Sequence, residues 1–375
     1  MSDIAMSGAA PVTDRPFSTP GRRYRITTRT RASAVAALAG VALVVLLFAV
    51  PFIAGRALIQ DLFFVLTMLC LAQYWNLLAG FAGLVSVGQQ AFVGLGAYGL
   101  FALLILFGVD PLLAIPLAGL GTALVALPTA FVVFRLRGPY FAIGTWVVAE
   151  VFRLLLAQFK SLGGGTGTSL PKAATNESFA VVQVADWLGL RSAAARDIVA
   201  YWLALALAVF TILLIYRVLR SRAGLALSAI RDSEAAASSV GVDAMRTKLW
   251  VYVLCAFGTG MTGALIYLQT AHISPDAAFS VLDWTAMVIF IVVIGGIGSI
   301  EGPIVGVIVF FIMQDQLAAF GPWYLMLLGA LAIVVMLFFR KGLWGTFADK
   351  YDLHLFPVRR RFELIDDLDS SGGKK

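Results

Sequence analysis

The chain has 375 residues, of which 60% are hydrophobic and 13% are charged, whereas soluble domains average about 45–50% apolar and about 25% charged residues. This excess of apolar residues excludes an ordinary soluble domain and predicts an all-α, polytopic integral membrane protein. The net charge of +7 does not predict nucleic-acid binding, because the basic residues cluster beside apolar segments and not on one soluble face.

The apolar runs predict about ten transmembrane helices, because a helix needs about 20 apolar residues to cross the hydrocarbon core. A basic N-terminal segment, 1–31, precedes the first run, which is longer than the 7–15 residues of a signal-peptide core and is expected to be retained. The predicted helices cover about 32–52, 59–79, 84–107, 111–134, 139–159, 198–216, 249–270, 282–298, 303–320 and 322–339.

The basic residues also predict the orientation. If both termini are cytoplasmic, the cytoplasmic segments hold 22 of the 28 Lys and Arg residues and the outer segments hold five. The transmembrane domain is then 32–340, with an outer loop at about 160–197 and a cytoplasmic loop at about 217–248. We expect the outer "LGGGTGTSLP" to be a flexible loop. The cytoplasmic tail, 341–375, ends in "ELIDDLDSSGGKK", whose charge and low apolar content predict disorder.

The stretch "GLVSVGQQAFVGLGAYG" (83–99) mixes small and polar residues inside an apolar run. Gly88 and Gly94 are typical of close helix packing in a membrane. Polar side chains are expensive against lipid, so those in this stretch should face the bundle or a wet pathway. The polar candidates are Ser86, Gln89, Gln90 and Tyr98.

The predicted helix 139–159 contributes four more candidate pathway residues, Tyr140, Thr145, Glu150 and Arg153. Glu150 lies about 11 residues, or about 16 Å, into this helix, near the middle of the hydrocarbon core. Arg153 follows at the i+3 position and can pair with it. The pair is either a structural ion pair that holds the helix to its neighbours or part of a pathway.

The cytoplasmic loop is longer than a connection requires, and 225–240 has a helical pattern. Leu227, Ile230, Ala237 and Val240 fall on one stripe, and Gly241 lies where a left-handed C-terminal cap is expected. Arg231, Asp232 and Glu234 are polar, while Ala235 and Ala236 would let another protein approach closely. The segment is either a solvated connector or a docking surface.

Near the C-terminal end of the membrane domain, "GGIGSIEGPIVG" predicts a packed corner or a broken turn. Gly298, Gly302 and Gly306 recur at four-residue intervals after Gly295, and Pro303 suits the first turn of the next helix.

No pattern predicts a catalytic or metal site. Cys70 and Cys255 fall inside apolar runs and are expected to be core residues, and His272 and His354 have no ligand pattern around them. The string "GGGTGTS" (163–169) lacks the lysine of a phosphate-binding loop, so no nucleotide or other cofactor is expected in this chain.

The string "EAAASSVGV" resembles the coupling loop of ABC importer permeases, although its glycine comes one position later than in the most general motif. The wider string "GLALSAIRDSEAAASSVGVD" is similar to the branched-chain amino-acid permeases of the LivM type. Three further strings agree with that branch: "GLVSVGQQAFVGLGAYG", "RLRGPYFAIGTWVVAEVFR" and "GGIGSIEGPIVGV". The resemblance covers about 60–341.

This resemblance implies a transport subunit of the bacterial inner membrane. The coupling residues would dock on an ABC ATPase, which binds the ATP, and they are Leu227, Ile230, Arg231, Asp232, Glu234, Ala235, Ala236 and Gly241. The other expected partners are a second, non-identical permease, a periplasmic substrate-binding protein, a small-molecule substrate and membrane lipid.

Two alternatives stay open. A permease for urea or short amides would look very similar. An ion-coupled secondary transporter would use Glu150 for coupling, although the coupling loop argues against it. A membrane enzyme is disfavoured, because no nucleophile–base, metal or paired-carboxylate pattern is present.

Overall fold

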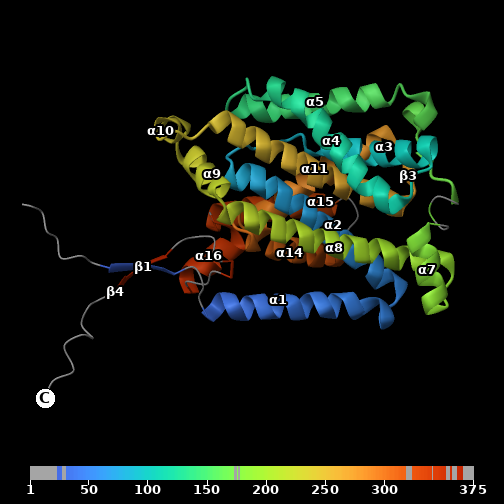
Figure 1. Ribbon diagram of the computed structural model, residues 1–375, viewed down its shortest axis with the longest axis horizontal. Helices are drawn as coiled ribbons and strands as arrows, with labels where there is room; N and C mark the ends of the chain where they lie inside the picture. Colours follow the sequence, from blue (N-terminus) through green and yellow to red (C-terminus); the bar gives the residue numbers. More distant parts are fainter. Residues whose placement is uncertain are drawn as a thin grey trace, which may run out of the picture.

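The computed structural model describes residues 23–27, 31–172, 175, 178–317, 323–339, 341–351, 355–356 and 361–365. In this part of the chain nearly all secondary structure is helical, and long helices run side by side along one axis (Figure 1). The prediction of an all-α, multi-pass membrane protein is therefore confirmed. Eight described helical stretches are long and apolar enough to cross a membrane.

The eight stretches correspond to the predicted runs with shifted ends. They are α2 with a π-helical last turn η2 (Arg56–Phe81), α3 (Gln89–Phe107), α4 (Pro111–Val133), α5 (Pro139–Leu156), α8 (Ser192–Arg220), α11 (Ala244–Thr270), α12 to α13 (Pro275–Gly295) and a stretch over α15 and α16 (Gly329–Lys350). The predicted runs 32–52 and 303–320 correspond to α1 (Arg31–Ala49) and the 17-residue α14 (Glu301–Leu317).

The shorter elements lie mostly at the ends of these helices. The helical ones are η1 (Val50–Phe52), η2 (Leu77–Phe81), η3 (Lys160–Leu162), η4 (Gly164–Thr166), α7 (Phe179–Leu188), α9 (Arg222–Asp232), α10 (Glu234–Ser239), α12 (Pro275–Ala278), η5 (Leu282–Ala286), α13 (Met287–Gly295), α15 (Trp323–Phe338) and α16 (Gly342–Tyr351). The strands are β1 (Arg23–Thr27), β2 (Thr168–Ser169), β3 (His272–Ile273) and β4 (Arg361–Ile365).

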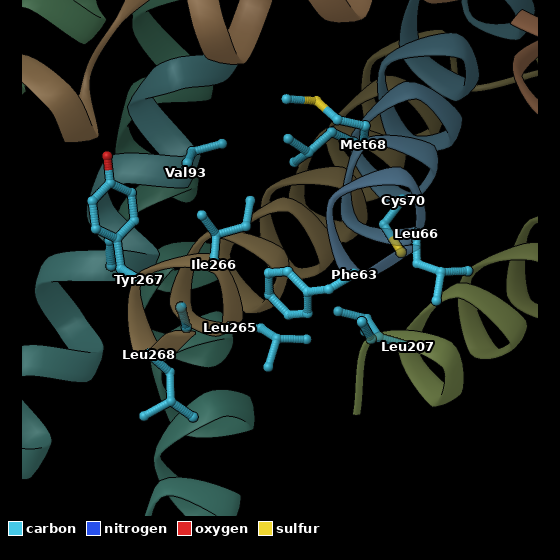
Figure 2. Close-up of a cluster of buried hydrophobic side chains, with 14 of the residues drawn as sticks. Phe63, Leu66, Met68, Cys70, Val93, Leu207, Leu265, Ile266, Tyr267 and Leu268 are labelled. Atoms are coloured by element: carbon cyan, nitrogen blue, oxygen red, sulfur yellow. The ribbon is translucent and has the colours of Figure 1, made fainter. Parts of the chain in front are cut away.

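Helix α2 lies at the centre of the core. Every residue from Leu66 to Asn76 is buried, so this helix is surrounded by protein on all sides, as expected for a helix that is apolar all round. Figure 2 shows Phe63 and Met68 of α2 among side chains of α3, α8 and α11, including Val93 and Leu207. Close packing around α2 holds the other helices at fixed positions.

The two ends of the bundle differ. One end carries α9, α10, α16 and the antiparallel pair of β1 and β4, and the opposite end carries α7 and β3 (Figure 1). We refer to them as the α9–α10 end and the α7 end. By the distribution of basic residues, the α9–α10 end is the one expected in the cytoplasm.

Several expectations about loops are wrong. The glycine-rich outer loop forms the turns η3 and η4 and the strand β2, which pairs with β3 through Thr168 and Ile273. This is possible because Gly163, Gly164 and Gly167 have φ angles of +88°, +56° and +85°, which favour glycine.

The predicted disorder of the tail is also wrong in part, because α16 (Gly342–Tyr351) is helical and Glu363 to Ile365 belong to β4. The strand forms because it finds a partner in β1, where Arg23 pairs with Ile365. The tail residues 352–354, 357–360 and 366–375 lie outside the described residues, and so do the N-terminal Arg15 and Arg22.

Two helix boundaries matter for the site. The predicted helix 84–107 begins only at Gln89, and 84–88 is not helical. The predicted helix 282–298 begins earlier, at Pro275, contains the π-helical turn η5, and ends at Gly295. The non-helical residues 84–88 and the π-helical turn η5 are therefore irregular backbone among the membrane helices. Such backbone must be covered by protein or line a wet cavity.

Candidate functional site

The helix α3 starts deep inside the bundle. The side chain of Gln89, its first residue, donates from Nε2 to the carbonyl oxygen of Leu71 on α2, at 2.9 Å. Leu71 lies ten residues before Phe81, the end of that helical stretch, which is about 15 Å along the axis. The residues 82–88, here called the entry segment, therefore run back into the bundle in a non-helical conformation.

Hydrogen bonds hold the entry segment against three elements. The indole Nε1 of Trp75 on α2 donates to the carbonyl oxygen of Ser86 at 2.8 Å. The amide of Val87 donates to Oγ1 of Thr145 on α5 at 3.1 Å, and the amide of Gln90 donates to Oγ1 of Thr285 in η5 at 3.2 Å. The irregular backbone thus obtains from side chains the partners that a continuous helix would have supplied.

Gln90 and Thr285 form the most buried polar contact of this region. Both are at most 1% exposed, and the Thr285 hydroxyl also donates to Oε1 of Gln90. The π-helical turn carries Thr285 to this position; such turns often occur at functional sites. The sequence prediction missed Thr285, because a single threonine in an apolar run gives no signal. Ser86, Gln89 and Thr145, which the sequence did predict, are buried beside it.

The two glycines of this stretch allow close packing, as predicted. A Cβ atom on Gly88 would lie 2.2 Å from the carbonyl oxygen of Thr145, and a Cβ atom on Gly94 would lie 2.5 Å from the ring of Phe279. Gly88 therefore brings α5 against the entry segment, and Gly94 seats Phe279 against α3. Tyr98 packs against the same ring, with centroids 6.2 Å apart.

Glu150 and Arg153 form the predicted ion pair, at 2.5 Å. Arg153 also pairs with Asp276 of α12 at 2.5 Å, which the sequence did not predict. α5 ends at Leu156, so Arg153 lies in its last turn, toward the α7 end, and Glu150 lies one turn before it. The central depth of Glu150 in the membrane stays a prediction. The side chains of Glu150 and Asp276 are 45% and 82% exposed, so this cluster is open on one side.

These contacts bring five of the eight predicted pathway residues to one seam, where α3 meets α5 and the α12–η5 stretch: Gln90, Tyr98, Thr145, Glu150 and Arg153. Ser86 and Gln89 bond to α2 instead, through Trp75 and Leu71. Tyr140 does not join the seam, because it is 71% exposed near the start of α5. The seam runs from the charged cluster at the α7 end, past Tyr98 and Phe279, to the amides and hydroxyls around Gln90.

At the α9–α10 end, the predicted single helix 225–240 is broken in two. Ser233 separates α9 from α10 and caps α10 by accepting a hydrogen bond from the amide of Ala236. Gly241 has a φ angle of +85°, as the predicted left-handed cap requires. The predicted stripe is only partly right, because Val240 is 77% exposed while Ala237 is buried.

One face of α9 and α10 is buried against this chain, and the opposite face is exposed. Leu227 and Ile230 are at most 5% exposed within this chain, so they do not present a surface to a partner as the sequence had suggested. Asp232, Glu234 and the two alanines after Glu234 are exposed. We call residues 232–236 the docking surface. Lys248 of α11 braces it through an ion pair with Glu234 at 2.6 Å.

Arg231 connects α9 to the entry segment. Its Nη1 donates to the carbonyl oxygen of Gly80 at 3.1 Å, and its side chain packs against Gly83, where the entry segment begins. A displacement of α9 therefore has a direct contact through which it can move the entry segment.

The glycine corner between α13 and α14 packs against the same region. Gly295 allows the backbone of Gly302 to approach, since a Cβ atom on Gly295 would lie 1.9 Å from the Gly302 carbonyl oxygen. Gly298 has a φ angle of +79°, so the turn is tight, as expected. Pro303 lies in the first turn of α14, and Gly306 packs closely against the backbone of Ile291.

Two amides of α2 complete this corner, and the sequence prediction missed both. Asn76 accepts from the amide of Gly298 and donates to the carbonyl oxygen of Ser299, each at 2.8 Å. Gln73 donates to the carbonyl oxygen of Ile300 at 2.7 Å. These polar residues lie inside an apolar helix, so only the fold shows that they bind irregular backbone.

The sequence prediction also missed a buried charge, Asp197 near the start of α8. Its carboxylate is 1% exposed and accepts from Arg56 Nε at 2.5 Å and from Gln269 Nε2 at 2.8 Å. This contact joins α8 to α2 and α11 at the α7 end. Cys70 and Cys255 are buried and form no disulfide, as predicted.

Comparison with known proteins assigns the family. Residues 57–336 match the family described as branched-chain amino acid transport system / permease component. The chain belongs to this family. The match includes both the seam around Gln90 and the docking surface.

Two bacterial relatives and one archaeal relative are similar along much of their length. The high-affinity branched-chain amino acid transport system permease protein LivM of Escherichia coli is 30% identical over 314 residues, which is 81% of this chain and 73% of the relative. The protein of the same name from Salmonella typhimurium is 29% identical, over 80% of this chain and 73% of the relative.

The third relative is the probable branched-chain amino acid transport permease protein LivM of Methanocaldococcus jannaschii. It is 26% identical over 59% of this chain and 63% of the relative. No solved structure matches the chain.

Proposed function

We propose that this chain is the permease subunit of an ABC importer that carries branched-chain amino acids across the bacterial inner membrane. The observation that carries the proposal is the contact between the docking surface and the membrane pathway. Arg231 lies in the last turn of α9, directly before the docking surface, and it bonds to Gly80 beside the entry segment. A chain of the permease family with this connection is built to receive movement from outside the membrane.

The energy comes from a partner ATPase that binds ATP. The exposed residues 232–236 combine two acidic side chains with two alanines, so a groove on the ATPase can approach the α10 backbone closely. When the ATPase subunits close, α10 moves together with α11, because Lys248 of α11 pairs with Glu234 of α10. Ser233 joins α10 directly to the end of α9 and caps it. Arg231 passes this movement to the entry segment.

The substrate path follows the seam between α3, α5 and the α12–η5 stretch. Polar groups inside a membrane bundle are expensive unless they face one another or water, and this seam brings together the buried Gln90, Thr145 and Thr285. The charged cluster of Glu150, Arg153 and Asp276 lies at the α7 end, which is the outer end in this orientation. A periplasmic binding protein would deliver the substrate there.

A second permease covers the exposed side of α5. Only 17% of an 18-residue apolar stretch of α5 is buried within this chain, compared with 61% for α3. Lipid suits the apolar part of this face but not the exposed Glu150. The complete importer therefore contains this chain, a second permease, two ATPase subunits and a binding protein.

The test is uptake by the complete complex in vesicles. The five-component importer is reconstituted with ATP trapped inside and without any ion gradient, and labelled leucine or urea is supplied outside. ATP-dependent accumulation of leucine supports the proposal. Accumulation of urea alone would replace the substrate, and uptake that needs an ion gradient in place of ATP would overturn the proposal.

A further inference from the structure

The N-terminus of α3 is a set of hydrogen-bond donors at membrane depth. The first turn of a helix has amide groups without partners inside the helix, and the helix dipole places partial positive charge there. In α3 this turn begins at Gln89, level with Leu71 of α2, and not at the membrane surface. Such an end of an interrupted helix suits an anionic group of a substrate.

Two hydroxyls now occupy donors of this turn and of the entry segment. Thr285 accepts from the amide of Gln90, and Thr145 accepts from the amide of Val87. Hydroxyl oxygens are weaker acceptors for such donors than a carboxylate, because a charged acceptor makes a stronger hydrogen bond. A carboxylate that reached this turn would compete favourably for the same amides.

One side-chain donor at the turn has no partner at all. Gln90 is 1% exposed, its Oε1 accepts from Thr285, and its Nε2 makes no hydrogen bond. Gln89 also leaves Oε1 without a partner, although its Nε2 is bound to Leu71. An unsatisfied buried amide is costly and requires an explanation such as a ligand or an unseen water. Here the free donor and the helix terminus share one residue.

Movement of α5 can give access to this turn. Thr145 provides the α5 hydroxyl that holds the entry segment, and Gly88 brings the two backbones together. The rest of α5 is mostly exposed within this chain. Displacing α5 would release the amide of Val87 and uncover the start of α3.

We propose that the first turn of α3, with Nε2 of Gln90 and the released amide of Val87, binds the carboxylate of the zwitterionic substrate. This inference rests on the proposed function, because it takes the transported molecule to be an amino acid. It assigns Gln90 as a substrate-binding residue and Thr285 as the residue that positions its side chain. A neutral cargo such as urea would not need this donor set.

The test uses the reconstituted importer with Gln90→Met and Gln90→Glu. Methionine keeps the length of the side chain but has no donor, and glutamate keeps the shape and the acceptor for Thr285 while it replaces the free donor. The matched control is Gln73→Met, because Gln73 is also a buried glutamine with one unpartnered atom but lies away from the turn. Leucine uptake and ATP hydrolysis stimulated by the binding protein are measured per assembled complex.

We expect both Gln90 variants to lower leucine uptake on the order of tenfold or more, as for the loss of one hydrogen bond to a charged group. Stimulated ATP hydrolysis should persist, so the leucine transported per ATP falls, and Gln73→Met should leave that ratio unchanged. An unchanged ratio in both Gln90 variants would overturn the inference, and the amide would then hold only an internal water. If the unmodified importer takes up no leucine, the proposed function itself has failed.

Discussion

Replacing Gly241 with valine should break the mechanical link between the ATPase and the membrane helices. Gly241 has a φ angle of +85°, and a Cβ atom built on it would meet no heavy atom within 4 Å. The substitution therefore causes no clash, and its cost is the backbone strain of a β-branched residue in the left-handed region, about 1–3 kcal/mol. At about 1.4 kcal/mol per tenfold, this lowers the equilibrium ratio of the native to the relaxed loop by roughly five- to 140-fold.

The strain acts only on the end of α10. The amides of Gly241 and Val242 donate to carbonyl oxygens of Ser238 and Ala237, at 3.1 Å each, and relaxation of φ would break this cap. The docking surface would shift while the membrane helices stay in place. The variant should assemble normally but lose ATP hydrolysis stimulated by the binding protein, together with leucine uptake.

The assay compares three variants in the reconstituted importer. Gly241→Asn should be milder than Gly241→Val, because asparagine tolerates positive φ better. Gly121→Val is the matched control, since Gly121 of α4 also has open space around its Cβ position but no positive φ. Equal and undiminished uptake in Gly241→Val and the wild type would refute the reasoning.

Three further outcomes are expected. Asp197→Ala should destabilise the bundle by about 1–3 kcal/mol, because the side-chain amide of Gln269 loses its acceptor, whereas Arg56 is 59% exposed and water can solvate it. An unchanged midpoint of thermal unfolding in detergent would contradict this. The double variant Glu150→Gln with Arg153→Met should assemble, because it leaves only the largely exposed Asp276 unpaired. Its leucine uptake should fall while stimulated ATP hydrolysis continues. Uptake at the wild-type rate would exclude a pathway role for the pair. The purified chain alone should not hydrolyse ATP, and turnover at the rate of an ordinary ABC ATPase would contradict this.

The sequence predicted the bundle well because apolar length is a strong signal in a membrane protein. Its failures concern backbone that leaves the helix inside the bundle. The run 84–107 is long and apolar enough for one membrane helix, so nothing in its hydropathy shows that the helix starts only at Gln89. The start is set by side chains from elsewhere in the chain, Thr145 and Thr285, which satisfy the irregular backbone.

The candidate site was predicted in part for a similar reason. Polar residues in an apolar run are conspicuous, and so Gln89 and Gln90 could be named from the sequence. Their geometry depends on partners far along the chain, such as Leu71 and Thr285. The burial of Leu227 could not be predicted, because a stripe of apolar residues on a short helix does not reveal whether the bundle or a partner protein covers it.

The link between the docking surface and the entry segment is best tested by a distance measurement between two spin labels. One label is placed at Val85, in the entry segment, and the other at Leu124 on α4, both of which are exposed. The labels are attached to cysteines introduced at these two positions. The native Cys70 and Cys255 are at most 1% exposed and should not react with the thiol-directed label. We expect the Val85–Leu124 distance to change when the assembled importer binds ATP, and Arg231→Ala should abolish that change. A distance that stays the same with and without ATP, in an importer that transports leucine, would contradict the proposed coupling.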